Sequence, residues 1–195
     1  ADWAKILKVK LGRGEEEDKR MIRLIRSLTD KPIYVDANQG WPTKEHALMM
    51  CQWLAEQGVV MIEQPMPKHM DEEHAWLCEQ VELPILADEA CQTYDDVARL
   101  QPYYDGINIK LMKCGGVAEA RKMITLAREL GMQVMIGCMT ETRAGISAAT
   151  VLSPLVDYAD LDGHVLLGND PYDGIQIVDG KLTLVDKPGT GVSPL

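Results

Sequence analysis

Residues 32–65 read PIYVDANQGWPTKEHALMMCQWLAEQGVVMIEQP and contain one complete strand–helix–strand unit. The two ends of this stretch, Pro32–Ala37 and Val60–Pro65, are short apolar runs that predict buried strands. The longer amphipathic run Lys44–Gln57 predicts a helix between them, and Gly58 stands where that helix should end. A strand, a helix and a second strand in this order predict parallel strands joined by a right-handed crossover.

The same alternation extends in both directions from residues 32–65. The predicted strands are Ile6–Leu11, Pro32–Ala37, Val60–Pro65, Pro84–Glu89, Gly106–Leu111, Gln133–Cys138 and Tyr158–Gly163. The predicted helices are Glu15–Leu28, Lys44–Gln57, Glu72–Gln80, Tyr94–Gln101, Val117–Leu130 and Arg143–Leu152. Thr43 and Thr93 are expected to cap helix N-termini, and Gly131 is expected to end the helix before it.

Strict alternation of strands and helices fits two architectures, a β/α barrel and an open doubly wound sheet. Polar residues follow nearly every predicted strand, which favours the barrel, because barrel active sites form at the carboxyl ends of the strands. An open sheet would concentrate its site at one switch point. A complete barrel has eight strands in about 250 residues. Since only seven strands are predicted here, we expect at least one strand to be absent or supplied by another chain.

The chain is predicted to consist of two segments. Residues 1–164 are expected to form a partial barrel, with strands two to eight and the catalytic residues, and residues 165–195 a C-terminal tail. Within the tail, Ile175–Val178 and Leu182–Val185 flank Asp179-Gly180. This pattern is typical of a β-hairpin with a type I′ turn.

The composition argues against several classes of function. A formal net charge of −10 argues against nucleic-acid binding, which needs clustered Lys and Arg. No apolar run reaches the roughly 18 residues of a membrane span. No signal peptide is visible, although the chain begins at Ala1 rather than at a methionine. The five cysteines form no C-x-x-C pair, so we expect reduced thiols and a cytoplasmic location.

Acidic residues end three consecutive predicted strands. Asp36, Glu63 and Asp88 each follow an apolar run, and any one of them alone is more often a helix cap or a loop acid. Carboxylates on neighbouring strands converge at a barrel mouth, where they repel one another unless a cation lies between them. Hard oxygen ligands in a roughly octahedral arrangement suit Mg²⁺, so the sequence predicts a magnesium site.

Two other patterns do not predict metal sites. Asp36-x-Asn38-x-Gly40 resembles the start of an EF-hand loop, but Ala47 stands where that loop needs a glutamate. His69 and His74 lack the H-E-x-x-H spacing of zinc helices, and we expect both at the surface.

Lysines occupy inward positions on two predicted strands. Lys8 and Lys10 share one face of the first strand, because alternate strand residues point the same way, and their apolar neighbours indicate a buried strand. Two solvated lysines on an edge strand are the alternative interpretation of this pattern. Lys110 is expected to point inward across the barrel from Lys10, with Lys113 in the loop beyond.

The last two predicted strands end in Cys138 and in Asp160-Leu161-Asp162. Asp160 and Asp162 share a face and are expected to point inward, where two free carboxylates suit a cationic group of a substrate. A capped, water-solvated loop is the alternative interpretation of this pair. Cys138 taken alone is a small core residue.

Taken together and in order, these motifs resemble the enolase superfamily, in its muconate-lactonizing subgroup. The motifs are Lys8-x-Lys10, Asp36-Ala37-Asn38, Glu63-Gln64-Pro65, Asp88-Glu89 and Asn108-Ile109-Lys110. From Lys10 to Lys110 the site positions are separated by 26, 27, 25 and 22 residues, one strand–helix unit each. The resemblance implies a TIM-like (β/α)7β barrel, here without the N-terminal capping domain and the first barrel strand of the family.

Within this subgroup, Asp160-Leu161-Asp162 resembles a motif of the dipeptide epimerases. That resemblance implies Mg²⁺-dependent epimerisation of dipeptides such as L-Ala-D/L-Glu, by proton abstraction α to the C-terminal carboxylate. The implied roles are Mg²⁺ binding by Asp36, Glu63 and Asp88, proton transfer by Lys10 and Lys110, and substrate binding by Lys8, Cys138, Asp160 and Asp162. We expect burial and nearby cations to keep one of the two proton-transferring amines neutral by lowering its pKa.

Other functions stay open from the sequence. The subgroup also contains o-succinylbenzoate synthases, N-acylamino acid racemases and muconate cycloisomerases, whose substrates have no free ammonium group. A Schiff-base aldolase barrel also uses an inward lysine, but it needs no metal site of three carboxylates. An inactive fragment or binding module would keep the residues without the cap. We expect a dipeptide as the partner, no nucleic acid or membrane, and a cap supplied by another segment or chain; homo-oligomerisation is left open.

Overall fold

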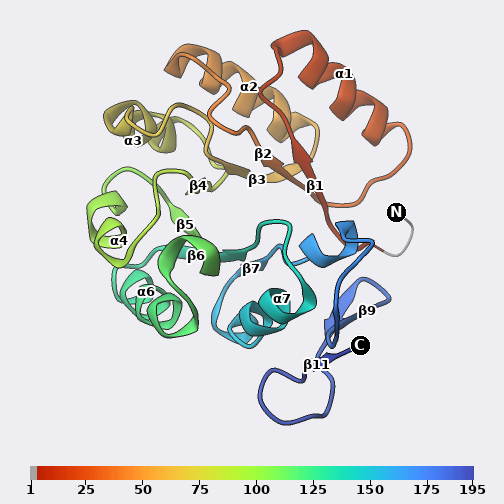
Figure 1. Cartoon of the computed structure of the whole chain (residues 1–195). Coiled ribbons are helices and arrows are strands. Elements are labelled where there is room, and N and C mark those ends of the chain that lie inside the picture. The colour runs from red at the N-terminus through yellow and green to blue at the C-terminus, as the bar shows by residue number, and fades with distance from the viewer. Residues whose placement is uncertain (1–3) are drawn as a thin grey trace.

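Seven parallel strands form one curled sheet at the centre of the molecule (Figure 1). The computed structural model describes residues 4–195. The strands follow the order of the sequence, as β1 (Leu7–Lys10), β2 (Ile33–Asp36), β3 (Val59–Glu63), β4 (Ile85–Ala87), β5 (Gly106–Lys110), β6 (Gln133–Gly137) and β7 (Tyr158–Ala159). The predicted alternation and the parallel pairing are both confirmed.

Helices cover the outer face of the sheet, as Figure 1 shows. They are α1 (Glu15–Arg26), α2 (Lys44–Glu56), α3 (Asp71–Gln80), α4 (Tyr94–Leu100), α5 (Leu111–Cys114), α6 (Val117–Glu129) and α7 (Arg143–Thr150). Buried apolar side chains from both layers, such as Val35, Leu54 and Ile62, form the main core between sheet and helices. None of the described helices combines the length and the apolar character that a membrane crossing requires.

The inside of the curled sheet has a small core of its own. It consists of Tyr34, Met61, Leu86, Met135 and Tyr158. Alternate strand residues face the same side, so Asp36 points the same way as Tyr34, two positions before it. By the same two-residue spacing, Glu63 points the same way as Met61, and Asp88 points the same way as Leu86. The inner core is therefore the floor beneath the three predicted metal ligands.

The strand register aligns the residues at the carboxyl ends of neighbouring strands. Lys10 pairs with Asp36, and Asp36 pairs with Glu63, across β1, β2 and β3. Lys110 is the last residue of β5, where it pairs with Gly137. Because all these strands run in one direction, their last residues lie along one rim of the curled sheet.

The sheet does not close within residues 4–195. In this part of the chain β1 pairs only with β2, and β7 only with β6, so an open seam separates β1 from β7. A cavity of about 520 Å³ lies along the seam. It is lined by Lys8 on one side, by Ala159–Asp162 on the other, and by Ile177 and Leu182 of the tail. The observed architecture is a half-barrel.

Short elements make up the C-terminal tail. β9 (Gln176–Val178) and β10 (Lys181–Thr183) form the predicted hairpin. Asp179 and Gly180 between them have φ values of 49° and 72°, as a type I′ turn requires. β8 (Tyr172–Asp173) pairs with β11 (Ser193–Pro194), a contact that was not predicted.

Helix ends lie close to where the sequence places them. Gly58 and Gly131 have φ values of 72° and 75°, the left-handed conformation that ends a helix without a steric cost. The Thr43 hydroxyl accepts a hydrogen bond from a backbone N–H of the first turn of α2. Two short 3-10 helices, η1 (Ser153–Leu155) and η2 (Gly163–Leu166), were not predicted.

The predicted strand Tyr158–Gly163 is wrong beyond Ala159. The N–H of Asp160 makes a last backbone hydrogen bond to β6, and the chain then turns into η2. The alternation rule for strands therefore does not apply to Asp160 and Asp162. Both residues still line the seam cavity.

His74 is fully buried, contrary to the prediction, whereas His69 is exposed as expected. The His74 Nδ1 lies 2.7 Å from the Met70 carbonyl oxygen, and Nε2 accepts a hydrogen bond from the Met66 N–H. Burial lowers the pKa of His74. The imidazole is therefore a neutral core group with a partner on each nitrogen, which explains why it lies inside.

Candidate active site

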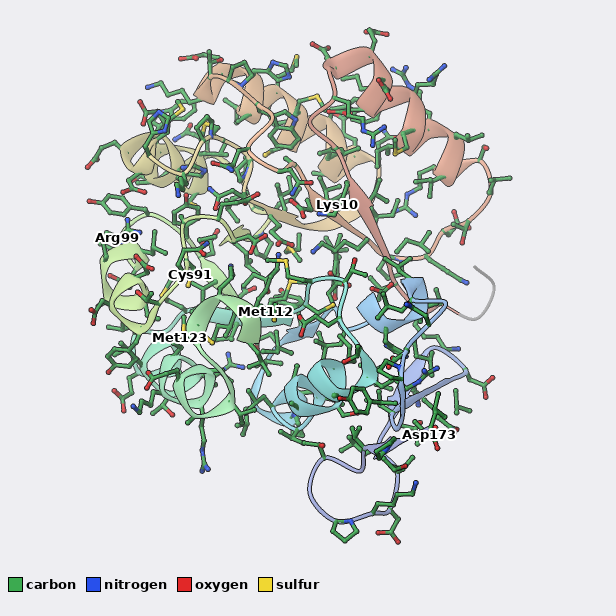
Figure 2. All side chains as sticks on the ribbon, viewed as in Figure 1. Lys10, Cys91, Arg99, Met112, Met123 and Asp173 are labelled. Carbon is green, nitrogen blue, oxygen red and sulfur yellow. The ribbon has the colours of Figure 1, made fainter. Side chains whose placement is uncertain are left out.

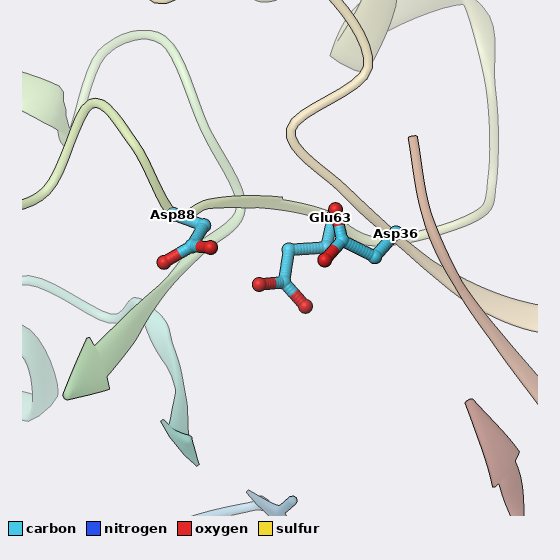
Figure 3. Close-up of side chains that lie close together, drawn as sticks. All are labelled: Asp36, Glu63 and Asp88. Atoms are coloured by element: carbon cyan, nitrogen blue, oxygen red, sulfur yellow. The ribbon is translucent and has the colours of Figure 1, made fainter. Parts of the chain in front are cut away.

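Asp36, Glu63 and Asp88 come together at the mouth of the curled sheet (Figure 3). Asp36 and Glu63 are the last residues of β2 and β3, and Asp88 directly follows β4. One carboxylate oxygen from each residue lies within 4.8 Å of the other two, and all three residues are buried. The structure thus brings together the three carboxylates that the sequence singles out.

These three carboxylates form a ligand set that fits Mg²⁺. They offer only carboxylate oxygens, the ligand type that this ion prefers. Two ligands that are each about 2.1 Å from one ion lie at most about 4.2 Å apart. Three ligands evenly spaced around one such ion lie about 3.6 Å apart, so oxygens separated by up to 4.8 Å would need to move closer together by up to about 1.2 Å to share it.

Burial and mutual repulsion govern the charge of this cluster. Burial raises the pKa of the Glu63 carboxyl, the Lys8 ammonium opposes that increase, and the charges of Asp36 and Asp88 add to it. Burial acts in the same direction on Asp88, but two lysine ammonium groups outweigh it and lower the pKa. Positive charge is therefore most lacking at Glu63, in the middle of the set.

Lys8 extends from β1 into the centre of the cluster. Its Nζ lies 2.8 Å from Glu63 Oε2 and 3.8 Å from Asp36 Oδ2, and it donates a hydrogen bond of 2.8 Å to Asp160 Oδ2. Burial alone would lower the pKa of Lys8, but these carboxylates outweigh burial and raise it. Lys8 is thus a fixed ammonium, and it ties β1 to the residue after β7 across the seam.

Lys10 and Lys110 contact the two outer carboxylates of the set. Lys10 Nζ donates to Asp36 Oδ2 at 2.8 Å and to Asn38 Oδ1 at 3.3 Å. Its side chain is 65% exposed, on the β1 side of the opening (Figure 2). Lys110 Nζ donates to Asp88 Oδ2 at 2.6 Å, and its side chain is only 8% exposed. Two amines therefore flank the set, one open to solvent and one enclosed.

The carboxylates around Lys110 raise its pKa, so the expected lowering would have to come from the positive charge of Mg²⁺ itself. Burial does lower the pKa of Lys110, but the carboxylate of Asp88, with a smaller effect of Glu63, outweighs burial and raises it. The expectation considered the neighbouring cations and overlooked the direct hydrogen bond to a carboxylate. Lys110 is therefore an ammonium group whose proton points at Asp88.

Lys113 was expected in a loop, yet it belongs to the site. α5 begins directly after Lys110, and its single turn brings Lys113 Nζ to 2.6 Å from Asp88 Oδ1 and 2.7 Å from the Asp88 carbonyl oxygen. The same Nζ donates to the carbonyl of Asn108, whose side-chain amide donates to Glu63 Oε1 at 2.7 Å. No sequence signal identifies this contact, because Lys110 ends β5 and only Lys113 lies in the helical turn that follows.

Asp160 and Asp162 lie at the seam. Both line the seam cavity together with Lys8. Burial raises the pKa of Asp162, and the neighbouring charge of Asp160 adds to the increase. Cys138 directly follows β6, and burial raises the pKa of its thiol to about 12, so the thiol is neutral. The seam side of the site is therefore an anionic wall with a small neutral neighbour.

The arrangement has three chemical capacities. A divalent cation fits between the three carboxylates, and a carboxylate ligand of that cation would lie beside the Lys8 ammonium. The amines of Lys10 and Lys110 can exchange protons with a group held between them. Asp160 and Asp162 can accept hydrogen bonds from a cationic group in the seam cavity.

Comparisons with known proteins place this geometry among related folds. The whole chain, residues 1–195, matches the family described as enolase C-terminal domain-like. It is 59% identical over 187 residues to a Bacteroides thetaiotaomicron protein named L-Ala-D/L-Glu epimerase, covering 96% of this chain and 48% of that protein. The structure is similar to that of a dipeptide epimerase from Enterococcus faecalis complexed with Mg and the dipeptide L-Leu-L-Tyr. This pair has 36% identity and a TM-score of 0.89, over 97% of this chain and 56% of the other.

A further similar structure has a different substrate in its name. It is an N-succinyl Arg/Lys racemase from Bacillus cereus, with 26% identity and a TM-score of 0.91, over 98% of this chain and 54% of the other. The chain spans about half the length of the curated relatives it matches. Because related folds accept different substrates, the substrate has to be argued from the side chains of the site.

Proposed function

The chain belongs to the enolase C-terminal domain-like family, and on this basis we propose that it carries the active site of a Mg²⁺-dependent dipeptide epimerase. The reaction is inversion at the α-carbon of the C-terminal residue in dipeptides such as L-Ala-D/L-Glu. The observation that carries the proposal is the placement of Lys10 and Lys110 beside the two outer members of a buried set of three carboxylates. The name of the relative that is 59% identical supports the substrate class.

Asp36, Glu63 and Asp88 are the residues that would hold Mg²⁺. When bound, the ion supplies positive charge that stabilises the negative charge developing on the substrate carboxylate as the α-proton leaves. Lys8 supports the same charge from the protein side, because its ammonium is fixed beside Glu63 at 2.8 Å. These groups are oriented before the reaction begins, which reduces the cost of reorganising them.

The two flanking lysines account for inversion. An α-proton next to a carboxylate is very weakly acidic, so its removal needs both charge stabilisation and a base within reach. In this scheme Lys10 takes the proton from one face of the α-carbon, and Lys110 delivers a proton to the opposite face; the reverse reaction exchanges the two roles. Lys110 is held as an enclosed ammonium, which suits a proton donor. Lys10 is exposed at the other end of the set and exchanges its protons with solvent.

The seam residues support a substrate with a free α-ammonium group. Asp160 and Asp162 line the seam cavity, and the anionic character of this wall suits the ammonium end of a dipeptide. Cys138 is close to both aspartates and would contact the same end of the substrate. N-acylamino acid racemisation is the second candidate function, favoured by the similarity to the N-succinyl Arg/Lys racemase. An N-acyl substrate has no ammonium group to offer these aspartates, so Asp160 would keep only its contact with Lys8.

Asp162→Asn is expected to lower kcat/KM for L-Ala-L-Glu by about 10- to 100-fold. The substitution removes the charged acceptor of a charge-assisted hydrogen bond, which is worth about 1.5–3 kcal/mol. The measurement is the initial rate of epimerisation in the intact protein, followed by polarimetry. Asp186→Asn is the matched control, because Asp186 is exposed in the tail and lies outside the residues that line the cavity.

An unchanged kcat/KM in Asp162→Asn would show that Asp162 does not bind the ammonium group. If the unsubstituted protein converted N-succinyl-arginine faster than any dipeptide, N-acylamino acid racemisation would be the favoured function. Both assays use the same protein, so they separate the role of Asp162 from the choice of substrate class.

We further propose that the seam between β1 and β7 accepts one more strand, and that a capping segment covers the mouth. Another segment or another chain would supply both. Three observations support this: the unpaired outer edges of β1 and β7, the cavity of about 520 Å³ between them, and the greater length of the relatives. In this scheme residues 1–164 are a partial barrel and residues 165–195 a tail that borders the seam.

We propose a reducing compartment, such as the cytoplasm, for the chain. The five cysteines are all free in the structure. Unpaired thiols are typical of proteins that fold and work under reducing conditions.

A further inference from the structure

Gln64, the first residue after β3, has all its side-chain hydrogen-bonding capacity in use although it is fully buried. Its Oε1 accepts hydrogen bonds from the backbone N–H groups of Asp88 at 3.0 Å and Ala90 at 3.1 Å. Its Nε2 donates to the carbonyl of Met66 at 3.2 Å and to the hydroxyl of Tyr104 at 3.0 Å. A primary amide has two donors and two acceptor positions, and each has a partner here.

The same residue connects the segments that carry all three carboxylates. Gln64 directly follows Glu63 in the chain. Its carbonyl accepts a hydrogen bond of 2.8 Å from the N–H of Gln39, three residues after Asp36. Its side chain holds the backbone of Asp88 itself. One residue thus fixes the ends of β2, β3 and β4 relative to one another.

The backbone of Gln64 is in a conformation that residues with a side chain rarely adopt. Its φ is +37°, and Asn38 and Gln39 in the loop that it contacts have φ values of +46° and +62°. Such positions cost free energy and persist only where surrounding contacts impose them. The left-handed turn at Gln64 directs its carbonyl toward Gln39 while its side chain reaches Asp88. Strain is thus concentrated where the ligand-bearing loops meet.

We propose that Gln64 is a positioning residue that sets the spacing of the three carboxylates for the metal ion. The inference rests on the proposed function, because it concerns the same Mg²⁺ site. Groups that orient metal ligands without touching the ion typically change metal affinity about 10- to 100-fold when they are removed. Among residues 4–195, no other side chain accepts hydrogen bonds from the backbone N–H groups of both Asp88 and Ala90. Loss of this amide therefore frees the Asp88 segment, while the strands and the carboxylates remain.

The test compares Gln64→Met with Tyr104→Phe. Methionine is close to glutamine in length and fills the same buried space. It has no oxygen to accept hydrogen bonds from the N–H groups of Asp88 and Ala90. Tyr104→Phe removes one hydrogen bond from the other end of the same amide and leaves both N–H contacts intact. Titration of each protein with Mg²⁺ by calorimetry, with melting temperature as a second readout, gives affinity and stability separately.

We expect Gln64→Met to weaken Mg²⁺ binding about 10- to 100-fold and Tyr104→Phe to change it by less than about 3-fold. Both variants lose thermal stability, since each breaks a buried hydrogen-bond network. Equal loss of Mg²⁺ affinity in the two variants, or unchanged affinity in Gln64→Met, overturns the proposal.

Amide hydrogen exchange in the unsubstituted protein tests the two N–H contacts of Gln64 without any substitution. The N–H groups of Asp88 and Ala90 lie outside β4, and the Gln64 side chain is the hydrogen-bond acceptor that protects them from exchange. We expect both to be protected more than tenfold relative to exposed loop amides, and fast exchange of both overturns the proposal. If the unsubstituted protein bound no Mg²⁺, the proposed function would fail, and this exchange measurement would still judge the role of Gln64.

Discussion

Lys10→Ala and Lys110→Ala are each expected to abolish epimerisation in the intact protein, with kcat falling by at least about 1,000-fold. A positioned acid or base contributes about 10²- to 10⁴-fold to a proton transfer, and inversion needs one on each face of the α-carbon. Neither lysine can replace the other, because they contact opposite members of the carboxylate set. The measurement is the rate of interconversion of L-Ala-L-Glu and L-Ala-D-Glu by chiral chromatography.

The two variants should differ in one informative way. Each keeps a single base, so each should still exchange the α-proton with D₂O for the one epimer whose proton faces the remaining lysine. Lys122→Ala is the control, since it removes an exposed amine on α6. Full epimerisation by either active-site variant would refute the two-base scheme.

Glu63→Gln is expected to produce the second large loss, a fall in kcat/KM of at least about 1,000-fold together with loss of Mg²⁺ binding. Metal ions contribute several kcal/mol of charge stabilisation to such steps, and about 1.4 kcal/mol corresponds to a factor of ten. Glu63 is the central carboxylate, so its neutralisation removes charge between Asp36 and Asp88 without changing the shape of the side chain. Treatment of the unsubstituted protein with EDTA should have the same effect, reversed by added Mg²⁺.

Glu119→Gln on the surface of α6 is the matched control for this substitution, because Glu119 only pairs with an exposed lysine. Activity that persisted in EDTA, or in Glu63→Gln, would point instead to the Schiff-base lysine chemistry of an aldolase-like barrel.

The order of strands and the convergence of the carboxylates follow from the sequence because both depend on local patterns. Apolar runs mark the strands, and parallel strands bring their carboxyl ends to one rim. Asp36 and Glu63 therefore had to lie side by side once β2 and β3 were recognised as neighbours. Lys10 joins the row by the same register.

The position of Lys113 and the end of the last strand depend on tertiary contacts that the local sequence pattern does not reveal. Lys113 reaches Asp88 only because α5 begins without a loop after Lys110, and nothing in the sequence marks that immediate start. The strand predicted through Gly163 ends at Ala159, since the chain there turns into η2 instead of continuing the sheet.

The roles of two buried polar residues could also not be predicted from local sequence patterns. His74 was expected at the surface, yet it is buried, and two backbone groups satisfy its ring. The role of Gln64 is visible only from its hydrogen bonds to Asp88 and Ala90, which are distant in the sequence. The Gln64 hydrogen bonds join residues 24 and 26 positions apart and leave no local periodicity.

The most direct test of the central claim is deuterium exchange with L-Ala-L-Glu in D₂O containing Mg²⁺, followed by proton NMR. The intact protein should replace the α-proton of the glutamate residue by deuterium and produce the L-Ala-D-Glu epimer, with no exchange at the alanine α-carbon. EDTA should stop both processes. Absence of α-exchange in the presence of Mg²⁺, or exchange that continues in EDTA, would contradict a metal-assisted proton abstraction between Lys10 and Lys110.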